Sequence, residues 1–389
     1  MTPPASPGNG PPEPAGATTA QVARMARVRD RMAELGVDAL LLSHGADLPW
    51  LTGYRAMPLE RLTLLVLPLV GDPVLVVPGL EAPRVTDAGD LFGMRPWSDA
   101  EDPIDVVVDL LGAGRSRLAV SDRAWATTVL ALQRRLPHAE WVEASRVTSP
   151  IRAVKDDDEI AALRAAGAAA DRVAAVLQAG GIPMVGRTEA EVSASLGAML
   201  VAEGHNAVNF AIVGSGPNGA SPHHEPGERV IGRSEVVVCD FGGTLSLDGG
   251  PGYCSDITRT VVTGAPSDEV ASCYAVLQEA QGAAVAAAVA GVTASSVDRV
   301  ARTVIEVAGL GDRFVHRTGH GIGIEEHEDP YLVVGNDEVL VPGHAFSIEP
   351  GIYLPGRFGM RLEDIVVIAA DGSPESLNRA DHDLVVVDA

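Results

Sequence analysis

The chain has 389 residues, enough for about two domains of ordinary size, and its formal net charge at pH 7 is −23. This charge excludes phosphate backbones and anionic membrane surfaces as partners, so we expect no nucleic acid and no membrane. The odd number of cysteines, Cys239, Cys254 and Cys273, predicts free thiols, and together with the lack of a signal-like segment it predicts a cytoplasmic location.

Residues 1–20 are rich in Pro, Gly and Ala and contain no apolar run, a composition typical of a disordered leader. From residue 21 to 148, short β-like runs alternate with helical ones, which predicts a compact α/β domain. A helix is expected over 21–35, strands in VDALLLSH, LTLLVLPL, DPVLVVP and RLAVSD, and a further helix in WATTVLALQRRL. No cluster of His, Asp and Glu occurs here, so this domain is expected to shape a site or an oligomer contact.

The second predicted domain covers residues 149–389. Its first segment, Ser149 to Gly180, looks like an interdomain connection that leads into a long alanine-rich helix with acidic residues at its start. Further helices are expected in TEAEVSASLGAMLVAEG and over 268–289 and 294–308, with strands and hairpins up to residue 263 and again from 345.

Asp240 and Asp256 flank a predicted hairpin, EVVVCDFGGTLSL and GYCSDITRTVV, with a turn around DGGP. Residue 248 is their midpoint, so we expect the two carboxylates to lie near each other across the strand pair, where opposed Cβ atoms approach to about 5 Å. A one-residue change of register would place them on opposite faces. Two solvent-facing aspartates beside a turn are the alternative, but an aspartate inside VVVCDF interrupts a buried run and calls for a nearby cation.

Three histidines are candidates for chemistry. His320 lies in RTGHGIGIEEHE between glycines that allow a ligand to approach closely, and His327 follows seven residues later. His223, in GASPHHEP, and His327 are candidates for substrate contact or proton transfer, because imidazole titrates near neutral pH. The remaining nearby histidines are interpreted as structural or surface residues: His224, His316 and His344. A solvated acidic rim is expected from Glu325, Glu326 and Glu328.

Two glutamates lie in β-like apolar runs near the C-terminus, Glu349 in AFSIEPGIY and Glu363 in GMRLEDIVVI. Their burial would be costly without a cation, as for Asp240. Arg361 is two residues before Glu363 and hence on the same strand face, where it could steady a ligating carboxylate. Asp364 is expected to point the other way and to be non-catalytic.

Four carboxylates and one imidazole have the composition of a two-metal hydrolase site for hard or borderline ions such as Mn²⁺. The five residues are Asp240, Asp256, His320, Glu349 and Glu363. One other motif, GSGPNG at 214–219, matches a dinucleotide-binding pattern. The segment that follows contains two prolines and cannot open the helix that a bound phosphate needs, so no dinucleotide is expected.

Six phrases in chain order resemble the pita-bread-fold metallopeptidases, a group that includes prolidases, Xaa-Pro aminopeptidases, methionine aminopeptidases and creatinases. They are GPNGASPHHEP, VVVCDFGG, YCSDITRT, RTGHGIGIEEHEDP, SIEPGIY and MRLEDIVV. The likeness implies a creatinase-like α/β N-terminal domain over 21–148, followed by an α+β pita-bread catalytic domain over 149–389.

The resemblance also implies a ligand for each of two divalent ions. Asp240 would bind one ion and His320 and Glu349 the other, whereas Asp256 and Glu363 would bridge both. A hydroxide held between the ions would attack the scissile carbonyl. Mn²⁺ is the favoured ion, with Co²⁺, Zn²⁺ and Fe²⁺ as alternatives.

The implied catalytic residues are His223, His327, Glu349 and Arg361. The two histidines would contact the substrate and stabilise the tetrahedral intermediate, and Glu349 would accept the proton of the attacking water. The implied activity is cleavage before proline in Xaa-Pro dipeptides or short peptides, by a cytoplasmic homodimer.

Two departures from the family pattern keep other activities open. The spacing 256 − 240 = 16 is longer than usual and indicates an insertion at the hairpin tip. Tyr331 stands where several prolidases have an arginine that holds the free carboxylate of a dipeptide, so no strong preference for dipeptides is expected and an Xaa-Pro aminopeptidase acting on longer peptides stays open. A creatinase-like C–N hydrolase and a non-catalytic binding protein are further alternatives, which the intact five-residue set argues against.

Overall fold

A computed structural model describes residues 18–85, 89–247 and 250–387 of the protein. Internal contacts divide the chain into two units, residues 1–151 and residues 152–389. Most of the predicted leader lies outside the described residues. Helix α1 (Thr19–Leu35) begins two residues earlier than predicted, because Thr18 and Gln21 form a capping box in which each side chain accepts a hydrogen bond from the other's backbone N–H.

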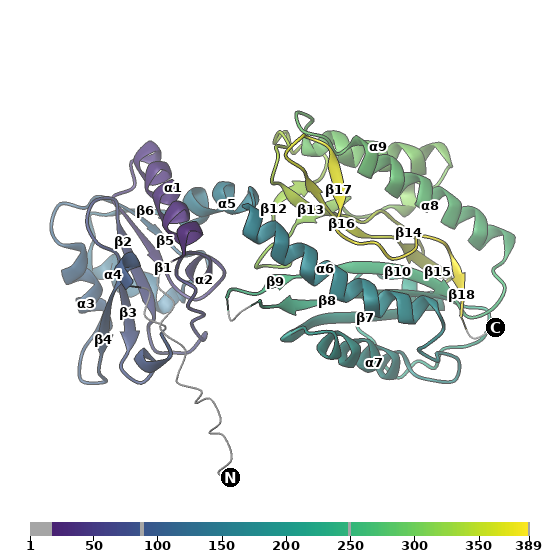
Figure 1. The fold of residues 1–389 in the computed structure, drawn as a ribbon, viewed down its shortest axis with the longest axis horizontal. Helices are drawn as coiled ribbons and strands as arrows, with labels where there is room; N and C mark the ends of the chain where they lie inside the picture. Colours follow the sequence, from purple (N-terminus) through teal and green to yellow (C-terminus); the bar gives the residue numbers. More distant parts are fainter. Residues whose placement is uncertain (1–17, 86–88, 248–249, 388–389) are drawn as a thin grey trace, which may run out of the picture. The chain divides into compact units, whose positions relative to one another are not determined.

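The first unit is built around one six-stranded mixed sheet, in the order β4-β3-β2-β1-β5-β6 (Figure 1). Its strands are β1 (Ala39–Leu42), β2 (Leu64–Pro68), β3 (Val74–Pro78), β4 (Gly93–Trp97), β5 (Arg117–Val120) and β6 (Glu140–Glu143). Its helices are α1, α2 (Asp47–Thr52), α3 (Pro103–Leu111) and α4 (Ala126–Arg135), with α5 (Ser145–Ala153) at its end and short 3-10 turns η1 (Ala82–Arg84) and η2 (Gly89–Leu91). Apolar side chains of α3 and α4 pack on the sheet in one buried cluster, so the predicted α/β alternation is confirmed.

The second unit contains two five-stranded sheets and a two-stranded ribbon. The first sheet has the order β18-β10-β8-β7, with β9 paired to β8: β7 (Ala207–Ser215), β8 (Val236–Leu245), β9 (Tyr253–Cys254), β10 (Ile257–Val262) and β18 (Val385–Val386). The second has the order β12-β11-β13-β16-β17: β11 (Gly319–Gly321), β12 (Glu328–Leu332), β13 (Ala345–Ile348), β16 (Asp364–Ile368) and β17 (Pro374–Ser376). The ribbon pairs β14 (Gly351–Leu354) with β15 (Phe358–Arg361).

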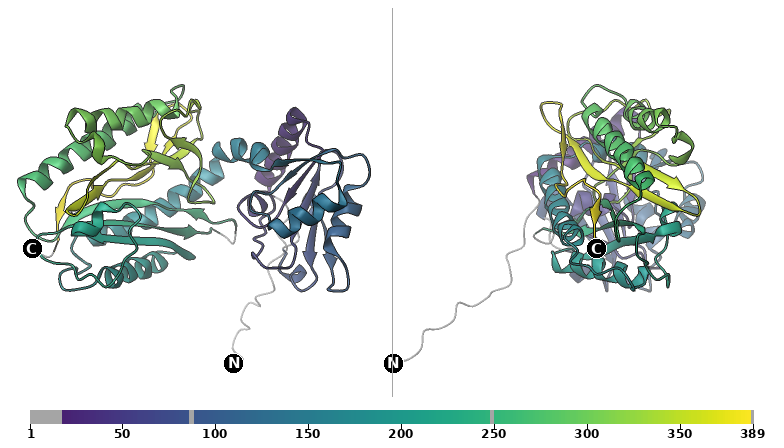
Figure 2. Two further views of the ribbon diagram at one scale, coloured as in Figure 1. Left: turned by 180° about the vertical axis from the view of Figure 1, so that it is seen from behind. Right: turned by 90° about the vertical axis from the view of Figure 1, so that its right-hand side faces the viewer.

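Each large sheet of the second unit has its own pair of helices. Helices α6 (Asp157–Gln178) and α7 (Glu189–Ala202) pack on the first sheet, and α8 (Asp268–Ala287) and α9 (Ala294–Val307) on the second (Figures 1 and 2). Two 3-10 turns, η3 (Gly216–Ala220) and η4 (Gly311–Arg313), complete the unit. The helical core positions are mostly Ala, Val and Leu, so burial of small apolar side chains holds the helices close to the strands.

The hairpin that carries Asp240 and Asp256 differs from the prediction by two residues of register. Asp240 pairs with Thr258 of β10 rather than with Asp256, and Ser255 N–H donates to Gly243 O, which places Asp256 opposite Gly242. A shift of two residues preserves the face of every side chain, so both carboxylates still lie on one face of the sheet. Gly242 makes the close approach feasible, because a Cβ there would lie 2.1 Å from the Ser255 carbonyl oxygen.

One further expectation needs correction. The run GMRLEDIVVI is not one strand: β15 ends at Arg361, β16 begins at Asp364, and Glu363 makes only an isolated bridge to Thr258 between them. The segment from Ser149 contains the end of helix α5, which continues to Ala153, and leads into the expected alanine-rich helix α6 with acidic residues in its first turn.

Other expectations hold. The GSGPNG segment forms the end of β7 and the short turn η3, not a dinucleotide-binding helix. All three cysteines are buried free thiols. Within the described residues, none of the helices combines the length and the apolar character that a bilayer crossing requires.

Candidate metal centre and active site

The five predicted metal ligands come together in one pocket of the second unit, with a volume of about 540 Å³. Asp240 lies on β8, Asp256 directly before β10 and His320 on β11, so both large sheets contribute. Glu349 directly follows β13, and Glu363 lies between β15 and β16. The predicted substrate-contacting residues line the same pocket: His223, His327 and Arg361. The sequence therefore identified a set that the fold gathers from five separate segments.

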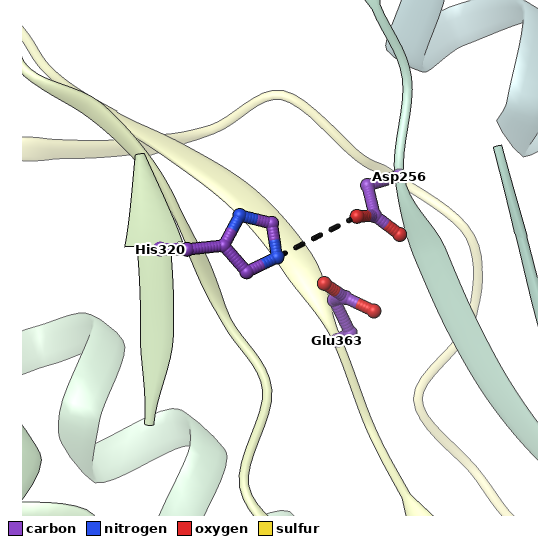
Figure 3. Close-up of side chains that lie close together, drawn as sticks. All are labelled: Asp256, His320 and Glu363. Atoms are coloured by element: carbon purple, nitrogen blue, oxygen red, sulfur yellow. Dashed lines mark ion pairs between the residues drawn. The ribbon is translucent and has the colours of Figure 1, made fainter. Parts of the chain in front are cut away.

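Three of these side chains approach closely enough to share one cation. Single ligand atoms of Asp256, His320 and Glu363 all lie within 4.8 Å of one another, and all three residues are buried (Figure 3). His320 Nε2 lies 3.7 Å from Asp256 Oδ2 and 3.3 Å from Glu349 Oε1. Oxygen donors with one imidazole nitrogen are a ligand set for hard or borderline divalent ions.

Several buried carboxylate oxygens in this pocket have no hydrogen-bond partner in the described part of the chain. They are Asp240 Oδ1, Asp256 Oδ1 and Glu363 Oε1. An anionic oxygen that is removed from water without a partner is strongly unfavourable, so three of them facing one pocket fit an arrangement that divalent cations complete. Because this observation comes from hydrogen-bond geometry, it is independent of the family resemblance.

The electrostatics of the pocket agree with a site built for positive charge. Burial, and then the nearby Glu363, Asp240 and Glu349 carboxylates, raise the pKa of Asp256 well above its usual value. Burial, and then Glu349 and Asp240, do the same to the pKa of Glu363. Burial raises the pKa of Glu349 to about 7. In the absence of a cation these carboxylates repel one another, and bound cations would remove that repulsion.

His320 is held in the tautomer that a metal ligand needs. Its Nδ1 lies 3.1 Å from the carbonyl oxygen of Gly321, and its backbone N–H donates to Ser347 Oγ over 3.0 Å. The carbonyl oxygen can only accept, so Nδ1 carries the proton and the lone pair is on Nε2, which faces Asp256 and Glu349. Burial, followed by the charge of His327, lowers the pKa of His320 well below its usual value and keeps the ring neutral.

Arg361 lies against Asp240, one of the candidate ligating carboxylates. Its Nη2 pairs with Asp240 Oδ2, and Glu349 Oε2 lies 3.9 Å from its Nε. Nη1 donates to the hydroxyl oxygen of Tyr353 over 3.0 Å, and His316 Nε2 lies 2.8 Å from the same oxygen. Arg361 thus steadies Asp240, as a partner that holds a ligating carboxylate in place.

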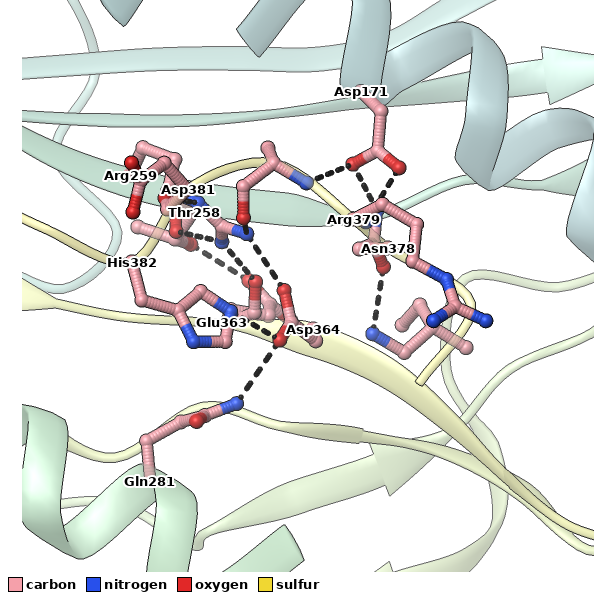
Figure 4. A network of polar contacts seen from close by, with 12 residues as sticks. Asp171, Thr258, Arg259, Gln281, Glu363, Asp364, Asn378, Arg379, Asp381 and His382 are labelled. Carbon is pink, nitrogen blue, oxygen red and sulfur yellow. Dashed lines mark hydrogen bonds and ion pairs between the residues drawn. The ribbon is translucent and has the colours of Figure 1, made fainter. Parts of the chain in front are cut away.

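Glu363 is positioned from the opposite side by Thr258, whose hydroxyl donates to Glu363 Oε2 over 2.6 Å. Beneath them lies a fully buried ion pair between Arg259 Nη2 and Asp364 Oδ1, at 2.8 Å (Figure 4). Arg259 Nη1 also donates to the carbonyl oxygen of Glu363, and Asp364 Oδ2 accepts from Gln281 and contacts His382. Asp364 therefore points away from the pocket, as predicted, and serves the scaffold.

Sequence reasoning missed part of the pocket lining. Phe210, Ile212, Pro222, Arg317 and Glu326 also face the pocket, and so does His316, which was interpreted as structural. Phe210 and Ile212 alternate with residues of the opposite face on β7, a pattern that could have indicated one exposed and one buried side. Arg317 gave no signal of its own, because a lone arginine beside a histidine is common on protein surfaces.

The predicted acidic rim is wrong for Glu325 and Glu328. Glu328 is nearly buried and pairs with Lys155 Nζ and Arg152 Nη2, and Glu325 Oε2 lies 3.0 Å from the same Arg152 nitrogen. Arg152 and Lys155, at the start of the unit, thus hold in place the loop that contains His327, a residue that lines the pocket. Three glutamates in four residues looked solvated, but the cations that neutralise two of them lie about 170 positions earlier, with separations of 173 and 176.

Comparison with protein families gives two matches that together cover most of the chain. Residues 24–154 match the Creatinase/Prolidase N-terminal domain, and residues 160–370 match Metallopeptidase family M24.

Individual proteins are similar over nearly the whole length. A probable dipeptidase PepE of Mycobacterium tuberculosis is 49% identical over 367 residues, which cover 94% of this chain and 96% of that protein. An Xaa-Pro dipeptidase of Lactobacillus helveticus is 35% identical, with 90% of this chain and 95% of that protein covered.

Solved structures show the same likeness. The structure of dipeptidase PepE from Mycobacterium ulcerans has a TM-score of 0.88 at 46% identity, covering 96% of this chain and 100% of that one. A prolidase from Thermococcus sibiricus has a TM-score of 0.87 at 35% identity with the same coverage. The fold of both units is therefore the one that the sequence predicted.

Proposed function

Because this chain belongs to metallopeptidase family M24 and carries a creatinase/prolidase N-terminal domain, we propose that it cleaves the peptide bond before proline in Xaa-Pro dipeptides, with two divalent ions as cofactors. The observation that carries the proposal is the set of unpartnered carboxylate oxygens on Asp240, Asp256 and Glu363, facing the imidazole of His320. Glu349 completes the ligand set. When bound, the ions would supply a nucleophilic water at neutral pH and polarise the scissile carbonyl.

The chain's own residues have distinct tasks in this proposal. Glu349 takes up the proton of the attacking water, a role that suits a carboxylate that lines the pocket beside the His320 imidazole. Burial, and then the charge of Arg317, lower the pKa of His327, so its neutral ring can donate a hydrogen bond to the substrate. His223 contacts the substrate from another wall of the same pocket. A bond to proline has no N–H, so recognition depends on the groups on either side of it.

Arg317 supports a substrate with a free carboxylate. It lines the pocket, and among the described residues it forms no ion pair with an acidic side chain. Its guanidinium carbon lies 4.5 Å from the centroid of the Tyr331 ring, and Nη2 lies 3.5 Å from His327 Nδ1. In a chain with a net charge of −23, a guanidinium without an acidic partner beside the reacting groups is suited to bind an anion, and the C-terminal carboxylate of a dipeptide is that group.

We also propose Mn²⁺ as the ion in use, with Co²⁺, Zn²⁺ or Fe²⁺ as substitutes, because carboxylate oxygens dominate the ligand set. A cytoplasmic homodimer remains the expectation from the family resemblance. Relatives named as dipeptidases and Xaa-Pro dipeptidases support the substrate class.

The test is a metal-reconstituted assay with three substrates: an Xaa-Pro dipeptide, an Xaa-Pro tripeptide and a dipeptide without proline. We expect the Xaa-Pro dipeptide to be cleaved fastest, and Asp240→Ala, His320→Ala and Glu363→Ala each to abolish cleavage. Faster cleavage of the tripeptide would assign the protein as an Xaa-Pro aminopeptidase instead. Full activity after exhaustive chelation, or in all three variants, would overturn the metal-dependent mechanism.

A further inference from the structure

Glu189, the first residue of α7, is a carboxylate without any exposed side-chain surface. It accepts hydrogen bonds from the backbone N–H and the hydroxyl of Ser215, over 2.8 and 2.6 Å. Asn218 Nδ2 donates to both of its carboxylate oxygens, over 3.1 and 3.0 Å. His224 Nε2 lies 2.7 Å from its second oxygen. Burial alone would raise the pKa of Glu189, but these hydrogen bonds outweigh burial and lower it, so the carboxylate is charged.

All of these partners belong to one short segment, residues 215–224, which begins at the last residue of β7 and contains η3. His223 directly precedes His224 and lines the pocket, whereas the His224 ring is bound to Glu189. On the other side of His223, the carbonyl oxygen of Pro222 accepts from Arg361 Nη1 over 3.2 Å. The backbone that carries His223 is therefore held on both sides, by Arg361 before it and by Glu189 after it.

The middle of the segment is fixed by backbone contact. A Cβ added to Gly359 would lie 1.9 Å from the carbonyl oxygen of Gly219, so η3 packs directly on strand β15. Ser215 is further held by Arg229, which donates to its hydroxyl and makes a two-pronged pair with Glu235. With these contacts in place, the Glu189–His224 pair holds the residue that directly follows His223.

We propose that Glu189 is a positioning residue for the reaction: it acts through His224 to aim the His223 imidazole into the pocket. The inference rests on the proposed function for its kinetic consequence, but the geometry that carries it lies outside the metal ligands. A catalytic donor displaced by about 1 Å can lose on the order of 100-fold in rate, so a contact one residue away can affect kcat without touching the substrate.

The kinetic experiment is a double-mutant cycle between Glu189→Gln and His223→Ala in the metal-loaded enzyme. His223→Ala is expected to lower kcat for an Xaa-Pro dipeptide by about 100-fold, as for loss of one donor to the reacting group. Glu189→Gln is expected to lower kcat by about tenfold with KM changed by less than about twofold, and to have almost no further effect when His223 is already Ala. Equal fold-losses in both backgrounds would show that Glu189 does not act through His223.

Variants at His224 provide the same test if Glu189→Gln does not fold. His224→Gln keeps a side-chain N–H that can donate to Glu189 and is expected to retain kcat within about threefold, whereas His224→Leu is expected to match Glu189→Gln. Asp38→Asn is the matched control: Asp38 accepts from two backbone N–H groups and the hydroxyl of Ser116, belongs to the first unit and does not line the pocket. It should lower stability and leave kcat unchanged.

A readout that needs no turnover separates this inference from the proposed function. The His223 ring resonance, assigned by its loss in His223→Ala, is followed by NMR in protein labelled at histidine. In His224→Leu and Glu189→Gln we expect the resonance to shift and broaden, and in His224→Gln to stay close to the parent position. An unchanged resonance in all variants overturns the positioning role even if no peptide is cleaved, whereas inactivity of the parent enzyme on every peptide overturns only the proposed function.

Discussion

The guanidinium group of Arg317 stacks over the ring of Tyr331, with its central carbon 4.5 Å from the ring centroid. The absence of an arginine at position 331 predicted no strong preference for a free carboxylate. The stacking supports the opposite proposal made above, because a positive charge from another part of the chain lies over that ring and lines the pocket. The phenol ring holds a planar cation in place without neutralising it.

Arg317→Met should therefore weaken cleavage of an Xaa-Pro dipeptide much more than cleavage of the corresponding Xaa-Pro amide. Loss of a charge-assisted hydrogen bond is worth about 1.5–3 kcal/mol, or roughly 10–150-fold in kcat/KM, and the neutral amide does not make that interaction. Steady-state kinetics on the two substrates measure the difference. Arg313→Met, on the exposed turn η4 four residues earlier, is the control and should affect neither. Equal losses on both substrates would contradict carboxylate binding by Arg317.

In the protein freed of metal by chelation, the free energy of unfolding should fall as the pH rises. Burial and neighbouring carboxylates raise the pKa of Asp256 and of Glu363 in the folded protein, so the folded state binds more protons than the unfolded state above about pH 4. The stability that these buried carboxyl groups contribute is present at low pH. It is lost as the pH rises through their pKa in the folded protein, which for Glu349 is about 7. Bound cations favour the ionised carboxylates, so the gain in Tm on adding Mn²⁺ should increase from pH 5.5 to pH 8.

Differential scanning fluorimetry with and without Mn²⁺ checks this pH dependence. Glu363→Gln, which cannot ionise, should flatten the pH dependence of the chelated protein and reduce the gain in Tm on metal addition. A gain in Tm that is the same at both pH values would contradict the assignment of the raised pKa values to the metal site.

His344 should contribute to acid instability. Burial, followed by the charge of Lys155, lowers its pKa from 6.5 to about 4, and the Glu338 carboxylate, 3.9 Å away, is too distant to offset burial. The unfolded state therefore binds a proton that the folded state excludes, so stability is present above about pH 6.5 and is lost as the pH falls towards 4. The slope approaches about 1.4 kcal/mol per pH unit.

Urea unfolding at pH 5.0 and 7.5 tests the contribution of His344. The variant His344→Gln, which has no titrating ring, is expected to lose less stability between the two pH values than the parent protein. The same loss in both proteins would assign the acid sensitivity to other groups.

Asp364→Asn should destabilise the second unit severely. Its carboxylate pairs with Arg259, and neither side chain has exposed surface, so the variant leaves a buried guanidinium charge without its counter-ion. Breaking such a pair costs about 3–5 kcal/mol. The exposed pair of Arg164 and Glu375 is the matched control, and Glu375→Gln should cost no more than about 1 kcal/mol. Urea titration of the parent protein and the two variants measures the loss in free energy of unfolding. Losses of similar size in the two variants would contradict the burial argument.

The sequence predicted the fold and singled out five candidate ligands that the fold brings into one pocket, because both leave local signals. Charges inside apolar runs identified Asp240 and Glu363, and strand-helix alternation identified the first unit. The register of the hairpin was wrong by two residues, because it depends on how Gly242 lets Ser255 approach rather than on the distance between the two aspartates. The error did not affect the site, since an even shift keeps each side chain on its face.

Interactions between distant segments were beyond the reach of the sequence. Glu328 looked solvated, because nothing near it in the chain reveals that Arg152 and Lys155 neutralise it. Arg317 and His316 line the pocket through the packing of β11 against its neighbours, and that geometry exists only in the folded protein. Local physics identified the residues that need a cation, whereas tertiary contacts decided which residues surround the substrate.

The burial of Lys155 also bears on chemical labelling. It is the only lysine of the chain, and only 1% of its side chain is exposed. Amine-reactive dyes, cross-linkers and acylating reagents therefore find no accessible lysine on the native protein. The ε-amino group becomes reactive only when its contact with Glu328 opens, so acylation at this one position would report, under native conditions, how often the loop that carries His327 comes free.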